Sequence, residues 1–279
     1  MNELALEPWL AAKRAEIDRV LDARLPQPQD DPNRLIEAMR YSLLAPGKRL
    51  RPILALAAAE AVGATVDEPV RIAAAAVELV HCYSLIHDDL PAMDDDDFRR
   101  GRPTNHKAFG EATAILAGDG LLTLAFDWMA QAGELTNRPA RYLGAVAALA
   151  RGAGIAGMVR GQARDMLPEP PQTLEGIERM HMEKTGALFR AALEVGAAVA
   201  GAKPAHLHAL AAFGTAYGIA FQHADDRDDD EHKAFAAVAE RRIHELVTEA
   251  IAALGELGEA AAPLCALARR LDTGAAKRE

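Results

Sequence analysis

Apolar residues recur at helical spacing along almost the whole chain, and this periodicity limits the possible folds more than any other feature. Leu35, Met39 and Leu43 repeat every four residues, as the buried face of a helix requires. Half of the residues are apolar but only 5% are aromatic, and Ala-rich runs are frequent, which favours closely packed helices over sheets. Alternating β-branched strand patterns are missing from the sequence. We therefore predict an all-α protein of about ten helices.

Glycine and proline indicate where these helices should end. A long apolar run from about 66 to 90 stops at Pro91. Further helical runs are expected at about 111–131, 141–162, 174–199, 205–226 and 231–254. The Pro-rich stretches are short enough to be loops between helices rather than linkers. Because 279 residues fall near the upper size for one continuous core, we expect a single domain, residues 1–279.

Charge and cysteine content narrow the classes of function. The net charge of −10 argues against a surface that binds nucleic acid or anionic membranes. Cys82 and Cys265 have no metal-site spacing and suggest no disulfide framework, which fits a reducing cytoplasm. Residues 1–18 do not have the pattern of a signal peptide, and no uncharged apolar run reaches the roughly 18 residues of a transmembrane helix. We expect a soluble, cytoplasmic protein without stable membrane insertion.

Two acid-rich segments each follow an apolar helical run. The first extends from His87 to Asp97 and the second from Gln222 to Asp230. Carboxylates at this density repel one another unless cations lie between them, and oxygen ligands without a Cys/His cluster suit Mg²⁺, which also binds substrate phosphates. Each segment by itself would also fit a solvated helix end. If the two segments face each other, they would form a metal-containing cavity for a diphosphate.

Helix geometry indicates which carboxylates can converge. In the second segment, Asp225 and Asp229 are four residues apart and therefore lie on one helix face. In the first segment, Pro91 cannot continue the helix smoothly. The break lets Asp94 turn back toward Asp88. Each segment can therefore present a pair of carboxylates to a metal ion.

Basic residues near these segments could hold the phosphate groups. Arg99 and Arg100 directly follow the first acid-rich segment, and arginines together with metal ions form phosphate clamps. Lys48 and Arg51 lie in a loop before a helix, where free backbone N–H groups also help to bind anions. An exposed basic turn is the alternative interpretation of this loop. Lys184 is a polar residue within an otherwise apolar helical run.

Taken together, these motifs resemble a known family. Their order is Gly47-Lys48-Arg49-Leu50-Arg51-Pro52, the stretch from His81 to Gly101, Lys184-Thr185, and Phe221-Gln222 before Asp225-Asp226. Over about residues 35–230 the chain resembles the all-trans polyprenyl diphosphate synthases, and among these the bacterial farnesyl diphosphate synthases. The resemblance implies an all-α isoprenoid-synthase bundle around a central cavity, usually in a homodimer. It also implies a prenyltransferase that condenses isopentenyl diphosphate with dimethylallyl or geranyl diphosphate to give farnesyl diphosphate.

The resemblance further implies roles for individual residues. Mg²⁺ ions, about three with substrate bound, would be held by Asp88, Asp94, Asp225 and Asp229. The allylic diphosphate would be bound by Arg99, Lys184, Thr185 and Gln222. Isopentenyl diphosphate would be bound by Lys48, Arg51, His81 and Arg100. The catalytic set would comprise Asp88, Asp89, Asp94, Arg99, Lys184 and Asp225. Tyr83 and Ser84, just before Asp88, would form the floor of the pocket that limits the length of the product.

The chain departs from the family after the second acid-rich segment. Family members usually continue with a loop that contains a Gly-Lys pair, whereas residues 230–235 here lead directly toward a helix. Arg227 also occupies a position that is generally apolar in the family. Lys233 follows Asp229 by four residues and could replace the missing lysine.

Three alternative functions remain open. A geranylgeranyl or other polyprenyl diphosphate synthase would use the same chemistry with a longer product. A terpene cyclase shares the fold and the ionisation step but needs no isopentenyl diphosphate, so Lys48, Arg51 and Arg100 argue against it. The shortened region after the second segment suggests a non-catalytic partner subunit, but the intact cluster around Asp88 and Asp94 argues against that function.

Overall fold

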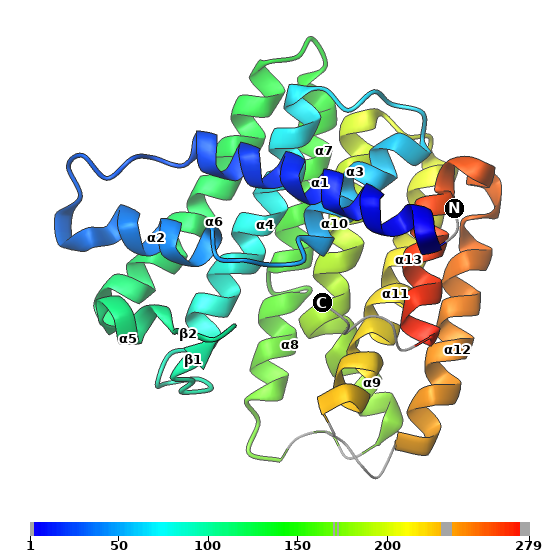
Figure 1. Ribbon diagram of the computed structural model, residues 1–279. Coiled ribbons are helices and arrows are strands. Elements are labelled where there is room, and N and C mark those ends of the chain that lie inside the picture. The colour runs from blue at the N-terminus through cyan, green and yellow to red at the C-terminus, as the bar shows by residue number, and fades with distance from the viewer. Residues whose placement is uncertain (1–2, 170, 172, 230–235, 274–279) are drawn as a thin grey trace.

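The computed structural model describes residues 3–169, 171, 173–229 and 236–273, and it is built almost entirely of helices (Figure 1). The helices of the first half are α1 (Glu3–Arg24), α2 (Leu35–Leu43), α3 (Leu50–Ala61), α4 (Glu68–Asp88), α5 (Asn105–Phe109) and α6 (Glu111–Glu134). Those of the second half are α7 (Pro139–Ala153), α8 (Met158–Asp165), α9 (Leu174–His181), α10 (Ala187–Ala200), α11 (Pro204–Asp229), α12 (Ala236–Ala253) and α13 (Ala262–Asp272). The predicted all-α fold is confirmed.

Helix α4 runs through the centre of the bundle and packs against α6, α3 and α10 (Figure 1). Its N-terminus is capped by Asp67, whose side chain accepts a hydrogen bond of 3.1 Å from the backbone N–H of Val70. Alanine, valine, leucine and isoleucine side chains from Val70 to Ile86 are buried along it. Each of the larger ones contributes about 1.5–3 kcal/mol when fully buried. The helix ends at Asp88, so the first acid-rich segment begins where the core ends.

Several helices are apolar enough to meet the length and composition criteria for crossing a membrane. Two such segments occur in the described part of the chain, and a bent pair could count as a third: Glu68–Asp88, Pro139–Asp165, and Val238–Ala253 with Gly255–Asp272. The sequence-based expectation considered only uncharged runs and therefore missed them, because α4 carries charged residues within its apolar length. In the folded protein 72% of the α4 window is buried, against 44% of the second window. The apolar side chains of α4 therefore form part of the core.

The helix predicted over 141–162 is instead two helices, α7 and α8, separated at Gly154–Gly157. The backbone of Gly157 has φ −146° and ψ −119°, which is far from helical. A side chain at this position would lie only 2.3 Å from the carbonyl oxygen of Gly152, so the turn requires glycine. After the break, α8 lies alongside Met182–Gly186, the segment that follows α9.

Two further local features differ from the sequence-based expectation. The run predicted over 174–199 contains a π-helical turn, Met182–Gly186, between α9 and α10. A short antiparallel hairpin also follows the first acid-rich segment, with β1 (Phe98–Arg99) paired to β2 (Arg102–Pro103). Its turn places Arg100 and Gly101 at φ 53° and 73°. The hairpin turns the two arginines after the aspartates back toward the bundle.

Helices α3 and α10 approach each other closely at Gly196. A Cβ atom added at Gly196 would lie 1.9 Å from the carbonyl oxygen of Ala55, a backbone atom that cannot move without displacing α3. Gly144 in α7 is a useful contrast, because a Cβ atom there would be 3.9 Å from the nearest atom, the Cβ of Ala198. Only the first glycine is required for helix packing.

We predict that Gly196→Ala lowers protein stability by about 1–3 kcal/mol, because it overpacks this contact. Gly144→Ala, the matched control, should raise stability by up to about 1 kcal/mol through helix propensity. Thermal unfolding followed by circular dichroism measures both effects. Equal midpoints for the two variants would contradict the close approach of α3 and α10.

Candidate active site

A cavity of about 400 Å³ lies between α4, α8 and the π-helical turn. Its wall contains seven residues that the sequence analysis selected: Arg51, His81, Tyr83, Ser84, Asp88, Lys184 and Thr185. Met93, Met158, Val159 and Met166 make much of the remaining wall apolar. The cavity therefore combines charged groups with an apolar channel, as a substrate with a diphosphate head and a hydrocarbon tail would require.

Asp88, at the end of α4, is half-buried in the cavity wall. Burial raises the pKa of its carboxyl to about 6, an effect that the Lys184 ammonium opposes and the Asp94 carboxylate strengthens. The backbone N–H of Asp94 donates a hydrogen bond of 2.9 Å to the carbonyl oxygen of Asp88. The chain thus turns back after Pro91, as the sequence predicted. A partly desolvated carboxylate of this kind gains free energy when a cation binds to it.

Lys184 and Thr185 reach the cavity from the π-helical turn, a backbone distortion that is frequent at functional sites. Lys184 forms an ion pair with Asp165 of α8. Gly161 makes this contact possible, because a side chain at that position would lie 2.1 Å from the backbone nitrogen of Lys184. The missing side chain at Gly161 therefore lets α8 lie directly against the turn.

The residues expected to bind isopentenyl diphosphate are not all in one place. Arg51 donates a hydrogen bond of 3.2 Å to His81 Nε2, and its guanidinium lies over the ring of Phe189, 4.3 Å from the centroid. Burial, together with the nearby positive charge of Arg51, lowers the pKa of His81 well below its usual value, so the ring is neutral. Burial also lowers the pKa of Arg51 to about 10. These two residues line the main cavity.

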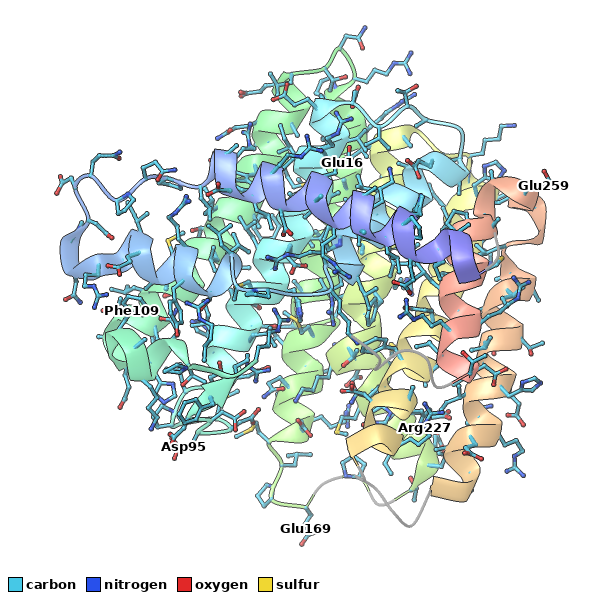
Figure 2. The ribbon with its side chains drawn as sticks, viewed as in Figure 1. Glu16, Asp95, Phe109, Glu169, Arg227 and Glu259 are labelled. Carbon is cyan, nitrogen blue, oxygen red and sulfur yellow. The ribbon has the colours of Figure 1, made fainter. Side chains whose placement is uncertain are left out.

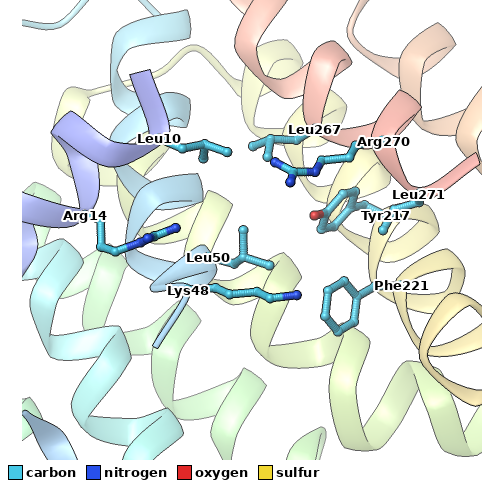
Figure 3. Close-up of a pocket in the computed structure, with 9 residues that line it drawn as sticks. All are labelled: Leu10, Arg14, Lys48, Leu50, Tyr217, Phe221, Leu267, Arg270 and Leu271. Atoms are coloured by element: carbon cyan, nitrogen blue, oxygen red, sulfur yellow. The ribbon is translucent and has the colours of Figure 1, made fainter. Parts of the chain in front are cut away.

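Lys48 and Arg100 lie outside the lining of the main cavity. Lys48 lines a smaller pocket of about 40 Å³ with Arg14, Phe221 and Arg270, and its side chain extends toward Phe221 (Figure 3). Arg100 donates a hydrogen bond of 2.9 Å to the carbonyl oxygen of Pro46. The hairpin is therefore tied to the loop that carries Lys48.

Asp89 and Arg99 form an ion pair with each other. Asp89 is buried and accepts a hydrogen bond of 2.7 Å from Arg99 Nε, while Arg99 Nη2 lies 3.6 Å from Asp96. Burial raises the pKa of Asp89, and the Arg99 guanidinium opposes the shift. Both residues line a pocket of about 50 Å³ beside the hairpin rather than the main cavity. Asp89 therefore positions Arg99, a role that the sequence did not reveal.

The role of Arg49 could not be predicted from the sequence. Its buried guanidinium makes three contacts, at 3.0 Å to Glu78 Oε1, 2.8 Å to Asp18 Oδ1 and 2.9 Å to the carbonyl oxygen of Ala45. Arg49 has a left-handed backbone, with φ 51°. These contacts fix the backbone between Lys48 and the start of α3, whose second residue is Arg51. Nothing in the sequence separates Arg49 from its basic neighbours, because its partners come from distant helices.

The second acid-rich segment lies at the end of α11. Asp225 is exposed, whereas Asp226 is buried and accepts a hydrogen bond of 2.8 Å from Gln222 Nε2. Gln222 Oε1 in turn accepts a bond of 2.9 Å from Thr185, so the second segment is linked to the cavity wall. Asp95 and Arg227, one from each acid-rich segment, lie toward the lower end of the bundle in Figure 2.

Some predicted metal ligands cannot be placed. The side chain of Asp229 and the whole of Lys233 lie outside the described residues. Within the part of the chain that is described, no three His, Cys, Asp or Glu side chains are grouped closely enough to hold a metal ion. The convergence of Asp88, Asp94, Asp225 and Asp229 on Mg²⁺ stays a prediction.

The cavity wall also contains polar atoms that would bind a polar ligand. Both polar atoms of the Gln162 side chain are buried without a hydrogen-bond partner, and so is Arg51 Nε. Unsatisfied buried groups of this kind each cost about 1–3 kcal/mol. With Asp88 and Lys184 in the same wall, the donor set suits a diphosphate and a hard divalent cation.

Comparison with known proteins identifies the family. A model of the polyprenyl synthetase family matches residues 32–234. Farnesyl diphosphate synthase of Geobacillus stearothermophilus is 44% identical over 234 residues, which cover 83% of this chain and 77% of that protein. Geranylgeranyl pyrophosphate synthase 12 of Arabidopsis thaliana is 44% identical over 223 residues, covering 78% of this chain and 61% of that protein.

Solved structures show the same similarity in three dimensions. An FPP/GFPP synthase from Zymomonas mobilis is 39% identical and superposes with a TM-score of 0.88, covering 95% of this chain and 98% of that one. A putative farnesyl-diphosphate synthase from Marinomonas superposes with a TM-score of 0.85 at 37% identity, covering 98% of this chain and 99% of that one. The resemblance inferred from the motifs is confirmed, and the chain belongs to the polyprenyl synthetase family of prenyltransferases.

Proposed function

We propose that this protein is a Mg²⁺-dependent synthase that condenses isopentenyl diphosphate with dimethylallyl or geranyl diphosphate to give farnesyl diphosphate. The observation that carries the proposal is one cavity whose wall contains Asp88 and Lys184 together with the Arg51–His81 pair and an apolar channel. Two separate groups of charged residues suit two diphosphate substrates. A terpene cyclase would have no need for the second group.

In the proposed reaction the allylic C–O bond breaks and its electron pair leaves with the diphosphate. Bound Mg²⁺, held by Asp88, Asp94, Asp225 and Asp229, would supply Lewis-acid stabilisation of that developing charge. Lys184, with Thr185 and Gln222, would bind the allylic diphosphate and compensate part of its charge. Arg51 and His81 would hold isopentenyl diphosphate so that its double bond lies beside the allylic carbon. A new C–C bond forms, and the departing diphosphate takes the proton that is lost.

The neutral state of His81 fits this assignment. A neutral imidazole that accepts a hydrogen bond from Arg51 keeps the guanidinium directed along the wall. Arg51 still carries its positive charge at neutral pH, because its lowered pKa is about 10. The desolvated guanidinium would interact strongly with a diphosphate.

Product length depends on the floor of the cavity beside Tyr83. The Tyr83 ring packs edge-on against His87, with the two centroids 5.7 Å apart. His87 Nε2 lies 3.1 Å from the carbonyl oxygen of Ile115. The His87 ring fills the space left by the missing side chain of Gly118, where a Cβ atom would be 2.1 Å from His87 Nε2. Because His87 holds the phenol ring in place, the ring can block growth of the hydrocarbon chain at the cavity floor. This supports farnesyl diphosphate as the product, with geranylgeranyl diphosphate as the alternative.

We further propose that the protein functions as a cytoplasmic homodimer that does not bind nucleic acid. Ile115 and Leu116 on α6 expose 44% and 51% of their surface, an apolar pair that a second copy of α6 could cover. The net charge of −10 supports the absence of nucleic-acid binding. Analytical ultracentrifugation of the protein tests the dimer.

We predict that Asp88→Asn lowers kcat by about 10²–10³-fold, because it removes the negative charge that would hold the cation. Asp30→Asn, in the exposed loop between α1 and α2, is the control and should leave turnover unchanged. The measurement is incorporation of labelled isopentenyl diphosphate into product with geranyl diphosphate and Mg²⁺. Full activity in Asp88→Asn would refute the site.

We predict that Tyr83→Ala yields products longer than farnesyl diphosphate, because the floor is removed. Tyr83→Phe keeps the ring and should keep the wild-type product. Chromatography of the dephosphorylated products distinguishes them. An unchanged product from Tyr83→Ala would show that another residue sets the length.

A further inference from the structure

A continuous polar network links the cavity to the outer helices on the side of α11. It begins at Thr185, whose hydroxyl bonds to Gln222, and continues through Gln222 to Asp226. The second carboxylate oxygen of Asp226 lies 3.2 Å from His181 Nε2, the last residue of α9. Asp226 and His181 are both buried. The orientation of Asp226 is thus coupled to the end of α9.

A second set of contacts, made by His223, Glu178 and Arg242, adjoins this network at His181. The His223 ring stands edge-on to His181, with centroids 5.1 Å apart and an interplanar angle of 79°. His223 Nε2 lies 3.2 Å from Glu178 Oε1. Arg242 of α12 binds both oxygens of Glu178, at 2.8 Å through Nε and 3.2 Å through Nη2. We call Glu178, His223 and Arg242 the α9–α12 clamp, since it joins α9, α11 and α12.

The geometry of the clamp makes it stronger than an ordinary surface ion pair. A two-point arginine–carboxylate contact fixes both position and direction. The side chains of Arg242 and Glu178 are 26% and 20% exposed, so solvent screens the pair only in part. His223 is buried between this pair and His181. A change at Arg242 would therefore be transmitted through His223 to the buried Asp226.

The end of a helix needs such lateral support. The last turn of α11 has carbonyl groups without intrahelical partners, and helix ends fray readily. Asp225 and Asp226 lie within the last two turns of α11, which ends at Asp229. Rotation of this end by a few tens of degrees would redirect the exposed Asp225 carboxylate. The clamp holds α11 from the side on which the network runs.

We propose that Glu178 and Arg242, acting through His223, are positioning residues that hold Asp225 and Asp226 in the orientation needed to bind a metal–diphosphate complex. This inference rests on the proposed function, because it assigns the clamp to the allylic half of the site. The isopentenyl diphosphate half, with Arg51 and His81 on α3 and α4, does not depend on the clamp. Loss of the clamp should therefore weaken the binding of the allylic diphosphate and leave the binding of isopentenyl diphosphate unchanged.

Arg242→Gln tests the proposal, with Arg241→Gln as the matched control. Arg241 is the neighbouring residue on α12, its side chain is 69% exposed, and it forms an ion pair of 3.7 Å with Glu245. Calorimetric titration with a non-ionising thiolo analogue of geranyl diphosphate, in the presence of Mg²⁺, measures binding without turnover. We expect about tenfold weaker binding for Arg242→Gln, the size of effect seen when residues behind metal ligands are removed. Arg241→Gln should bind as the wild type does.

Steady-state kinetics supply the second readout. Arg242→Gln should raise the Mg²⁺ half-saturation and the allylic KM about tenfold, with the KM of isopentenyl diphosphate unchanged. Glu178→Gln, an isosteric change, should have the same selective effect and keeps the proposal testable if Arg242→Gln does not fold. Arg242→Lys, which retains the charge but not the two-point contact, should recover part of the affinity.

The possible outcomes separate the two proposals. If both Arg242→Gln and Glu178→Gln bind the allylic analogue with wild-type affinity, the proposed role of the clamp is wrong. Equal losses of affinity for both substrates, together with a lower unfolding midpoint, would also overturn the proposed positioning role. They would indicate that the clamp has a purely structural role. Failure of the wild-type protein to bind the allylic analogue with Mg²⁺ would instead contradict the proposed function.

Discussion

Burial of α4 on almost every side is the constraint on which the rest of the structure depends. The helix buries most of its apolar side chains between Val70 and Ile86 and packs against α6, α3 and α10. Its position therefore cannot change without opening the core. The same helix carries His81, Tyr83 and Asp88 on the stretch that faces the cavity, so the core fixes one group from each functional part of the site. Rigid elements position site residues more accurately than loops do.

Electrostatics at the end of α4 then sets the chemistry. Asp88 is partly desolvated near another carboxylate, and its raised pKa of about 6 reflects the free-energy cost of that charge. Lys184 from the π-helical turn compensates part of it. Arg51 is desolvated as well. Its contacts with the ring of Phe189 and with His81 offset part of the free-energy cost of burying its charge. Asp88 and Arg51 are both charged and partly removed from water. A bound ligand of opposite charge would therefore stabilise each of them.

The sequence predicted the parts of this arrangement that depend on neighbouring residues. Helical periodicity located α4 and α6, and Pro91 correctly indicated the turn that brings the backbone of Asp94 to that of Asp88. The break at Gly157 was missed, because a glycine within an apolar run is compatible with a continuous helix. Motif order was sufficient to indicate the family.

Contacts between distant segments could not be predicted in this way. Arg49 looked like its basic neighbours, yet it is buried against Glu78 and Asp18. Arg99 was expected to bind the allylic diphosphate, but it pairs with Asp89. Lys48 lines a different pocket from Arg51. The same holds for Arg242 and Glu178, which are separated by 64 residues. Only the packing of whole helices brings such partners together.

We propose that one cavity binds two diphosphate substrates and joins them. Incubating the wild-type protein with Mg²⁺, isopentenyl diphosphate and geranyl diphosphate, followed by chromatography of the products, tests it most directly. We expect farnesyl diphosphate, formed only when both substrates and the metal are present. A cyclised hydrocarbon made from the allylic substrate alone, or no product at all, would contradict it.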